Sequence, residues 1–105
     1  MAENNELTRY KIKADILSLE KGLEHFEGLK AVRIVSKTYN LLIMDDYLPL
    51  IGEIEGDLFL ISPTEVVREF KNIQGFYRHS KNNFEFILKN RGQSAKSDNN
   101  WNSKI

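Results

Sequence analysis

Apolar and charged residues alternate near the start of the chain. Between Tyr10 and Ile16 every second residue is apolar, and the residues between them are Lys or Asp. A period of two places successive side chains on opposite faces, so this stretch predicts a β-strand with one dry face and one wet face. The next stretch has two readings, because apolar residues from Leu19 to Phe26 recur at helical spacing while Gly22 would cost a helix about 1 kcal/mol.

The sequence from residue 29 to residue 88 consists of short apolar segments separated by turn residues. Turns are predicted at Glu55-Gly56, Ser62-Pro63-Thr64 and Ser80-Lys81-Asn82-Asn83, because Gly, Pro, Asn and Ser favour turn conformations. This pattern is typical of a small all-β domain, a sandwich of about eight to ten short antiparallel strands. The further predicted strands are Leu29–Val35, Tyr39–Met44, Leu50–Ile54, Asp57–Ile61, Glu65–Phe70, Phe76–His79 and Phe84–Leu88.

The same alternation predicts the core of the sandwich. Inward side chains of two opposed sheets interdigitate and form one apolar layer. We expect most of this layer to come from Ile16, Val32, Ile34, Ile43, Ile54, Leu58, Leu60, Val67, Phe76, Phe86 and Leu88.

The chain has the length and composition of one domain. From its 105 residues, 41% of them hydrophobic, we expect one domain only. We expect residues 1–8 to be a flexible N-terminus, 9–89 the sandwich and 90–105 a polar, mobile tail, since the tail has too few apolar residues to offset its ordering entropy. Trp101, within the tail, is either a plain exposed residue or an anchor that docks into a partner.

The charge balance argues against nucleic-acid binding, and the N-terminus argues against a secreted protein. Fifteen basic residues balance fifteen acidic ones, so the chain supplies no positive field for nucleic acid. It contains no cysteine, which excludes disulfides and thiol catalysis. The polar N-terminus is unlike a signal peptide, and no apolar run has the length of a membrane span. We expect a soluble, cytoplasmic protein without direct membrane insertion.

Candidate catalytic residues are sparse. His25 and His79 occur in unrelated contexts, and we expect each to be a surface or rim imidazole and not a ligand. The adjacent carboxylates Asp45 and Asp46 lack the repeating oxygen ligands of a calcium loop, so they indicate a solvated loop. The dispersed glycines form no phosphate-binding motif. The sequence therefore predicts no catalytic, cofactor-binding or metal-binding residues, and no enzyme activity of its own.

Colinear segments carry a resemblance to a known family. They are Tyr10–Ser18, Phe26–Leu29, Val32–Val35, Tyr47–Ile51, Gly56–Ile61 and Ile73–Tyr77. In order and approximate spacing, over residues 9–89, they resemble the N-terminal β-sandwich of the epsilon subunit of F-type ATP synthases. Pro49, Gly56, Gly75 and Phe76 match that family's loop and turn positions, whereas Asp-Asp-Tyr-Leu replaces its Gly-His-Ala loop. The resemblance implies that residues 19–26 are extended.

The resemblance implies a coupling role without catalysis. It predicts a sandwich docked on a gamma-like rotor subunit, in indirect contact with the α/β hexamer, at the cytoplasmic face of a membrane. A membrane ring or another rotor-driven component would face the loop that carries Asp45 and Asp46. The family's C-terminal helical hairpin has no counterpart here, so we expect neither inhibition nor nucleotide binding. The predicted partner contacts are Asp45, Asp46, Tyr47, Leu48, Pro49, Tyr77, Arg78 and Trp101.

Two other function classes stay open on the sequence alone. The first is a stand-alone β-module that binds another protein through Tyr47, Tyr77 or Trp101. The second is a small nucleic-acid-binding barrel, in which the aromatic residues between Phe76 and Phe86 would stack on bases. Against the second class, the phenylalanines of this hairpin alternate as core residues do, and the net charge is zero.

Overall fold

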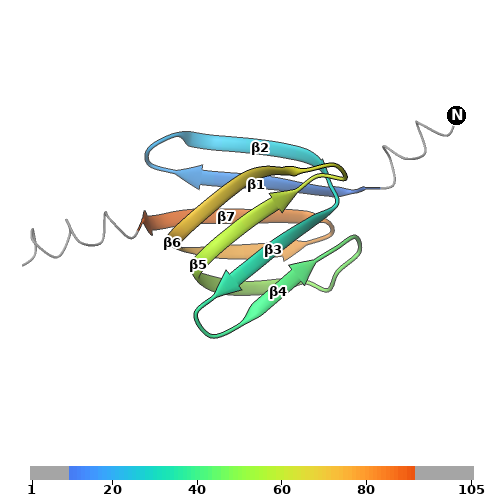
Figure 1. Cartoon of the computed structure of the whole chain (residues 1–105). Coiled ribbons are helices and arrows are strands. Elements are labelled where there is room, and N and C mark those ends of the chain that lie inside the picture. Colours follow the sequence, from blue (N-terminus) through green and yellow to red (C-terminus); the bar gives the residue numbers. More distant parts are fainter. Residues whose placement is uncertain (1–9, 92–105) are drawn as a thin grey trace, which may run out of the picture.

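The computed structural model describes residues 10–91, and this part of the chain is all-β. Within it, seven strands form one sheet in the order β2-β1-β7-β6-β5-β3-β4 (Figure 1). All neighbouring strands in this range are antiparallel except β1 and β7, which are parallel. The strands are β1 (Ile12–Ser18), β2 (Gly22–Leu29), β3 (Ala31–Ser36), β4 (Asn40–Ile43), β5 (Leu50–Ile61), β6 (Val66–Ser80) and β7 (Asn83–Arg91).

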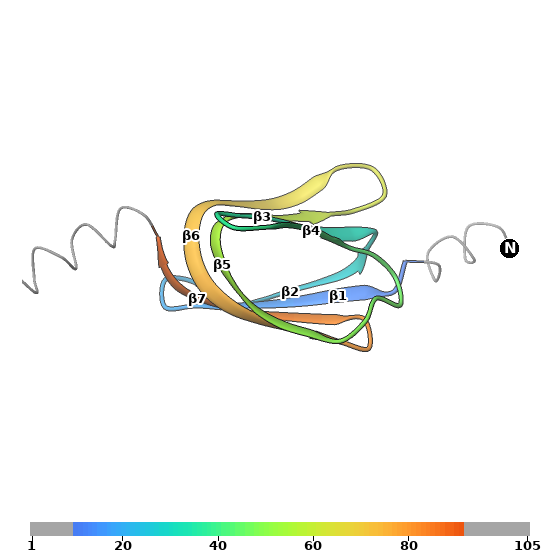
Figure 2. The ribbon, with the colours of Figure 1, turned by 90° about the horizontal axis from the view of Figure 1, so that it is seen from below.

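The sheet folds over on itself into two layers, because β5 and β6 are long and strongly bent (Figure 2). Layer A contains β2, β1 and β7 together with the start of β5 and the end of β6. Layer B contains β4, β3 and the remaining halves of β5 and β6. The buried side chains of both layers meet between them and form one core cluster. The predicted all-β class is confirmed.

The predicted number of strands was wrong, because the predicted turn at Glu55-Gly56 lies inside β5. At this point β5 bends and its pairing with β6 shifts register between Gly56 and Leu58. A bulge increases local bend and twist without ending a strand. A Cβ on Gly56 would overlap the carbonyl oxygen of Val35, so only glycine allows this close approach. β6 is likewise continuous from Val66 to Ser80, so two long strands replace four predicted short ones. The β1–β7 pair is parallel and departs from the predicted antiparallel arrangement.

The stretch from residue 19 to residue 26 is not helical: residues 19–21 form a turn, and residues 22–26 are extended as the first part of β2. A turn follows β1, and β2 begins at Gly22, whose φ of 71° lies in the left-handed region. β2 then pairs with β1 along its length. The hairpin predicted at Ser80–Asn83 is confirmed: Lys81 and Asn82 both have positive φ, as a two-residue hairpin turn requires.

Most of the predicted core is buried, and Val67 and Phe76 are the exceptions at 39% and 50% exposed. Val67 is the extra residue of a bulge, because Leu60 lies opposite Arg68 while Ile61 lies opposite Val66. Its position is thereby shifted away from the inward-facing side of β6. Both corrections concern β6, whose pairing with two neighbours the local sequence does not reveal.

The end of β6 alternates in the phase opposite to the predicted one. Tyr77 and His79 lie opposite Phe86 and Phe84 of β7, and all four side chains are buried. Directly opposite residues share a face of the sheet, so the phenylalanines of β7 draw Tyr77 and His79 into the core. Phe76 then faces solvent. The prediction that His79 is a surface or rim imidazole was therefore wrong: its side chain is 0% exposed.

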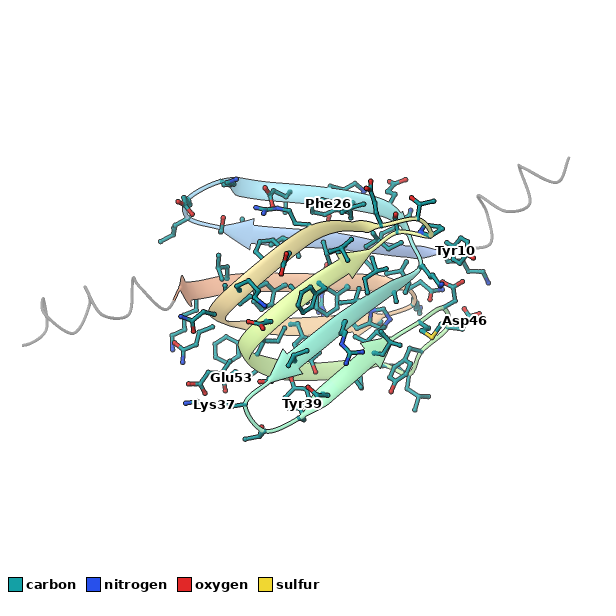
Figure 3. The ribbon with its side chains drawn as sticks, viewed as in Figure 1. Tyr10, Phe26, Lys37, Tyr39, Asp46 and Glu53 are labelled. Atoms are coloured by element: carbon teal, nitrogen blue, oxygen red, sulfur yellow. The ribbon has the colours of Figure 1, made fainter. Side chains whose placement is uncertain are left out.

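Two interactions link the layers at their open sides, a salt bridge on one side and a hydrogen bond on the other. On one side Arg68 of β6 forms a salt bridge of 3.3 Å with Glu24 of β2. On the other side the hydroxyl of Tyr39, just before β4, donates a 2.6 Å hydrogen bond to the carbonyl of Glu53 in β5 (Figure 3). Burial raises the pKa of Tyr39 well above its ordinary value, so this hydroxyl stays a donor.

Candidate docking surface

The loop between β4 and β5, residues 44–49, forms one end of the sandwich and is called the end loop here. Figure 3 shows its Asp46 at the same end as Tyr10, opposite the end that carries Lys37, Tyr39 and Glu53. In sequence this loop contains the carboxylate pair and the Tyr-Leu-Pro segment that were predicted to contact a partner. In the structure the five residues from Asp45 to Pro49 lie in this loop, at one end of the sandwich.

The end loop is tied to two other segments by hydrogen bonds. The backbone N–H of Lys11, ahead of β1, donates to Asp45 Oδ1 at 3.0 Å. The backbone N–H of Asp46 donates to Asn82 Oδ1 at 2.7 Å, and Asn82 Nδ2 donates back to Asp46 Oδ1 at 3.1 Å. Asn82 also accepts a backbone hydrogen bond from Lys13. The loop is thus fixed to β1 and to the β6–β7 turn.

The polar residues of the end loop position its backbone. Asp46 and Asn82 both have a φ near 60°, a conformation that Asp and Asn tolerate better than most residues. The hydrogen bond from Asn82 and the charge of Lys11 lower the pKa of Asp46 below its ordinary value, so it is a carboxylate at neutral pH. The role of the carboxylate pair in the described structure is to hold the loop.

The apolar residues of the end loop point outward. Leu48 is 73% exposed, Met44 45% and Tyr47 36%, and Pro49 is also exposed. Ile51, the second residue of β5, adds a side chain that is 82% exposed. Exposed apolar side chains gathered on one fixed loop are a feature of protein contact sites. Sequence analysis missed Met44 and Ile51, because their outward phase depends on the register of β4 and β5.

The remaining predicted contacts lie in three different environments. Arg78 is opposite Ile51 on the outer face of layer A, and its guanidinium forms a 2.6 Å salt bridge with Glu85. Tyr77 is instead 6% exposed and stacks on Phe84, so its side chain belongs to the core. Trp101 lies outside the described residues, as do the predicted N-terminus 1–8 and most of the predicted tail.

The two histidines have opposite environments. His25 is exposed on the outer face of layer A, where its ring nitrogens contact Asp15 at 2.5 Å and Glu27 at 2.8 Å. The hydrogen bond to Asp15 and then that to Glu27 raise the pKa of His25. His79 is buried, neither ring nitrogen has a hydrogen-bond partner among the described residues, and burial lowers its pKa.

Residues 10–91 lack the features of a metal site or a membrane-spanning helix, and most of their candidate stacking rings are buried. No group of three or more His, Cys, Asp or Glu in this range is arranged to hold a metal ion. No helix in this range could cross a bilayer. Of the aromatic residues proposed above for base stacking, Tyr77, Phe84 and Phe86 are buried, and Phe76 is exposed with Lys89 Nζ over its ring at 5.9 Å.

Comparison with known proteins shows a similarity in fold to a solved structure. No protein-family model matches the chain, and no curated protein matches it. Among solved structures, the fold is similar to a chain in the cryo-EM structure of the central stalk and c-ring of the Tetrahymena thermophila mitochondrial ATP synthase. The TM-score is 0.60 at 17% sequence identity, over 76% of this chain. This likeness establishes the fold. The match spans 64% of the length of that ATP synthase chain.

Proposed function

We propose that this chain is a non-catalytic, epsilon-like rotor subunit of an F-type or F1-like rotary ATPase. In this role it docks on a gamma-like subunit and couples ATP turnover in the α/β hexamer to rotation, at the cytoplasmic face of a membrane. The observation that carries the proposal is the fold shared with a central-stalk and c-ring structure. The colinear epsilon-like segments over residues 9–89 support the same reading.

The construction of the sandwich suits a part that transmits force. One continuous core joins both layers, and the two bent strands cross from one layer to the other without a break. Close-packed interiors have low compressibility and transmit strain, so torque applied at a docked face would reach the opposite end. The end loop is fixed by hydrogen bonds to two other segments, which limits its movement relative to the core.

The end loop is the proposed contact with the next rotor component. Its carboxylates are engaged in holding the loop, so the contact is made by Tyr47, Leu48 and Pro49 with Met44 beside them. Burial of a leucine side chain stabilises a complex by about 2 kcal/mol, and 1.4 kcal/mol is tenfold in affinity. Replacement of Leu48 by a charged residue is therefore expected to weaken the contact by roughly 30-fold or more.

The test is a pull-down of the tagged chain from its native cells under mild detergent, with mass spectrometry of the recovered proteins. The native chain is expected to recover α-, β- and γ-like ATPase subunits. Their absence, alongside robust recovery of a different protein, would overturn the rotor role and leave a stand-alone binding module. Salt-dependent recovery of RNA or DNA would instead indicate the nucleic-acid class.

Two variants test the end loop within the same experiment. Leu48→Asp is expected to lose the component that contacts the loop while it keeps the γ-like subunit. Leu19→Asp is the matched control, because Leu19 is fully exposed in the β1–β2 turn, away from the end loop. Equal recovery with both variants would show that the end loop is not a contact, without affecting the rotor proposal itself.

A further inference from the structure

The outer face of layer A carries four exposed apolar side chains in one line across four neighbouring strands. Leu23 of β2 lies opposite Leu17 of β1, Leu17 opposite Ile87 of β7, and Ile87 opposite Phe76 of β6. They are 66%, 45%, 56% and 50% exposed, in that order. We call them the apolar row. Glu53 of β5 ends the row on the far side of Phe76.

The apolar row is a continuous surface, because directly opposite residues on neighbouring strands have their Cβ atoms about 5 Å apart. Monomeric proteins rarely leave a continuous apolar patch of several large side chains in contact with water. The row is separate from the end loop, because β1, β7 and β6 carry a line of charged residues between the two, namely Asp15, Glu85 and Arg78.

The charges on the side of the row that faces the end loop are paired, and on the other side Lys89 Nζ lies 5.9 Å from the centroid of the Phe76 ring. Asp15 contacts His25, and Arg78 forms a salt bridge with Glu85. A strongly charged ligand would have to compete with these internal pairs, so the row suits an apolar side chain carried by a polar segment of low net charge. An aromatic ring fits best, because it covers several aliphatic side chains at once with little loss of conformational entropy.

The chain itself contains a segment of this kind. Residues 92–105 follow β7 directly, and their composition is polar except for Ala95, Trp101 and Ile105. Trp101 is the only tryptophan in the protein. β7 is parallel to β1 and ends four positions beyond Ile87, so the segment starts at the same end of the sheet as the row.

The length of the segment permits contact with every part of the row. Trp101 is ten positions after Arg91, and an extended chain reaches about 3.3 Å per residue, which gives roughly 33 Å. Neighbouring strands are about 4.8 Å apart, so the row from β2 to β6 is roughly 15 Å wide. We propose that the C-terminal segment 92–105 folds back over layer A and that the Trp101 side chain covers the apolar row. This inference does not depend on the rotor role.

The single tryptophan makes the proposal directly measurable in the full-length chain. The Trp101 fluorescence of the native protein is expected at shorter wavelength, and less quenched by acrylamide, than that of a synthetic peptide of residues 92–105. Ile87→Ser and Leu17→Ser are each expected to move the emission toward that of the peptide. Leu48→Ser is the matched control, since it removes an exposed leucine from the end loop and is expected to leave the emission unchanged.

A second variant checks the same contact from the other side. Trp101→Ala is expected to increase binding of the apolar dye ANS, and Ile87→Ser in the same chain is expected to reverse the increase. Circular dichroism and thermal unfolding establish that each variant is folded, which is expected because all the substituted side chains in the sheet are exposed.

Three results would overturn the proposal. The first is native emission equal to that of the peptide. The second is a blue shift that persists in both Ile87→Ser and Leu17→Ser, which would place Trp101 elsewhere. The third is a blue shift that grows with protein concentration, which would assign the row to a second copy of the chain.

Discussion

Replacement of His79 by leucine should stabilise the protein and make its free energy of unfolding less dependent on pH in the acidic range. His79 is 0% exposed, and neither of its ring nitrogens has a hydrogen-bond partner among the described residues. A buried polar group without a partner costs about 1–3 kcal/mol, and an apolar side chain of similar volume removes that cost. We therefore expect His79→Leu to raise the free energy of unfolding at neutral pH by about 1 kcal/mol or more.

The effect of pH has a definite sign. Burial lowers the pKa of His79 below its ordinary value of 6.5, so below that pH the unfolded chain binds a proton that the folded chain does not. The stability contributed by neutral His79 is complete above pH 6.5 and is lost as the pH falls towards the folded-state pKa. The loss is at most about 1.4 kcal/mol for each pH unit in this window.

Urea unfolding at about pH 7.5 and about pH 5.5 measures both effects. Between these values the native protein should lose up to about 1.4 kcal/mol through His79, a loss that His79→Leu lacks. With an m-value of about 1–3 kcal/mol/M, this loss moves the urea midpoint by roughly 0.5–1.4 M.

His25 supplies an internal control of opposite sign. Its pKa is raised by the hydrogen bonds to Asp15 and Glu27, so its stabilising contribution is present below pH 6.5 and is lost as the pH rises through the folded-state pKa. His25→Gln should therefore lose stability mainly at the acidic end. If native protein and His79→Leu show the same change between the two pH values, the reasoning about His79 is refuted.

Three further predictions concern the construction of the sandwich, each measured by urea unfolding. Gly75→Ala should destabilise by about 3 kcal/mol, because a Cβ would overlap a carbonyl oxygen of β7 and the Phe86 ring; equal stability would contradict this. Tyr39→Phe should lower the free energy of unfolding by about 1 kcal/mol, because its hydrogen bond to β5 is lost. An unchanged free energy of unfolding would show that this hydrogen bond does not stabilise the sandwich. Asn82→Ala should cost about 1 kcal/mol and raise the pKa of Asp46, measured by NMR titration; an unchanged pKa would contradict the assigned cause.

The sequence by itself determined the all-β class and most of the individual strands. These features depend on local information, namely the period of two, the β-branched residues and the turn residues, which act over a few positions. The hairpin at Lys81-Asn82 and the burial of Ile34 and Leu58 belong to this category. The sequence also indicated residues 45–49 as a loop, because adjacent carboxylates and a Tyr-Leu-Pro segment stand between two predicted strands; their role as partner contacts stays a prediction.

Only the tertiary structure decided how the strands combine. The bend at Gly56, the parallel pairing of β1 with β7 and the inward phase of His79 depend on partners far away in the chain. The alternation of Phe76 to His79 fits either phase locally, and the buried phenylalanines of β7 select one of them. The apolar row arises in the same way, since its four side chains come from distant segments and share a face only after the sheet has formed.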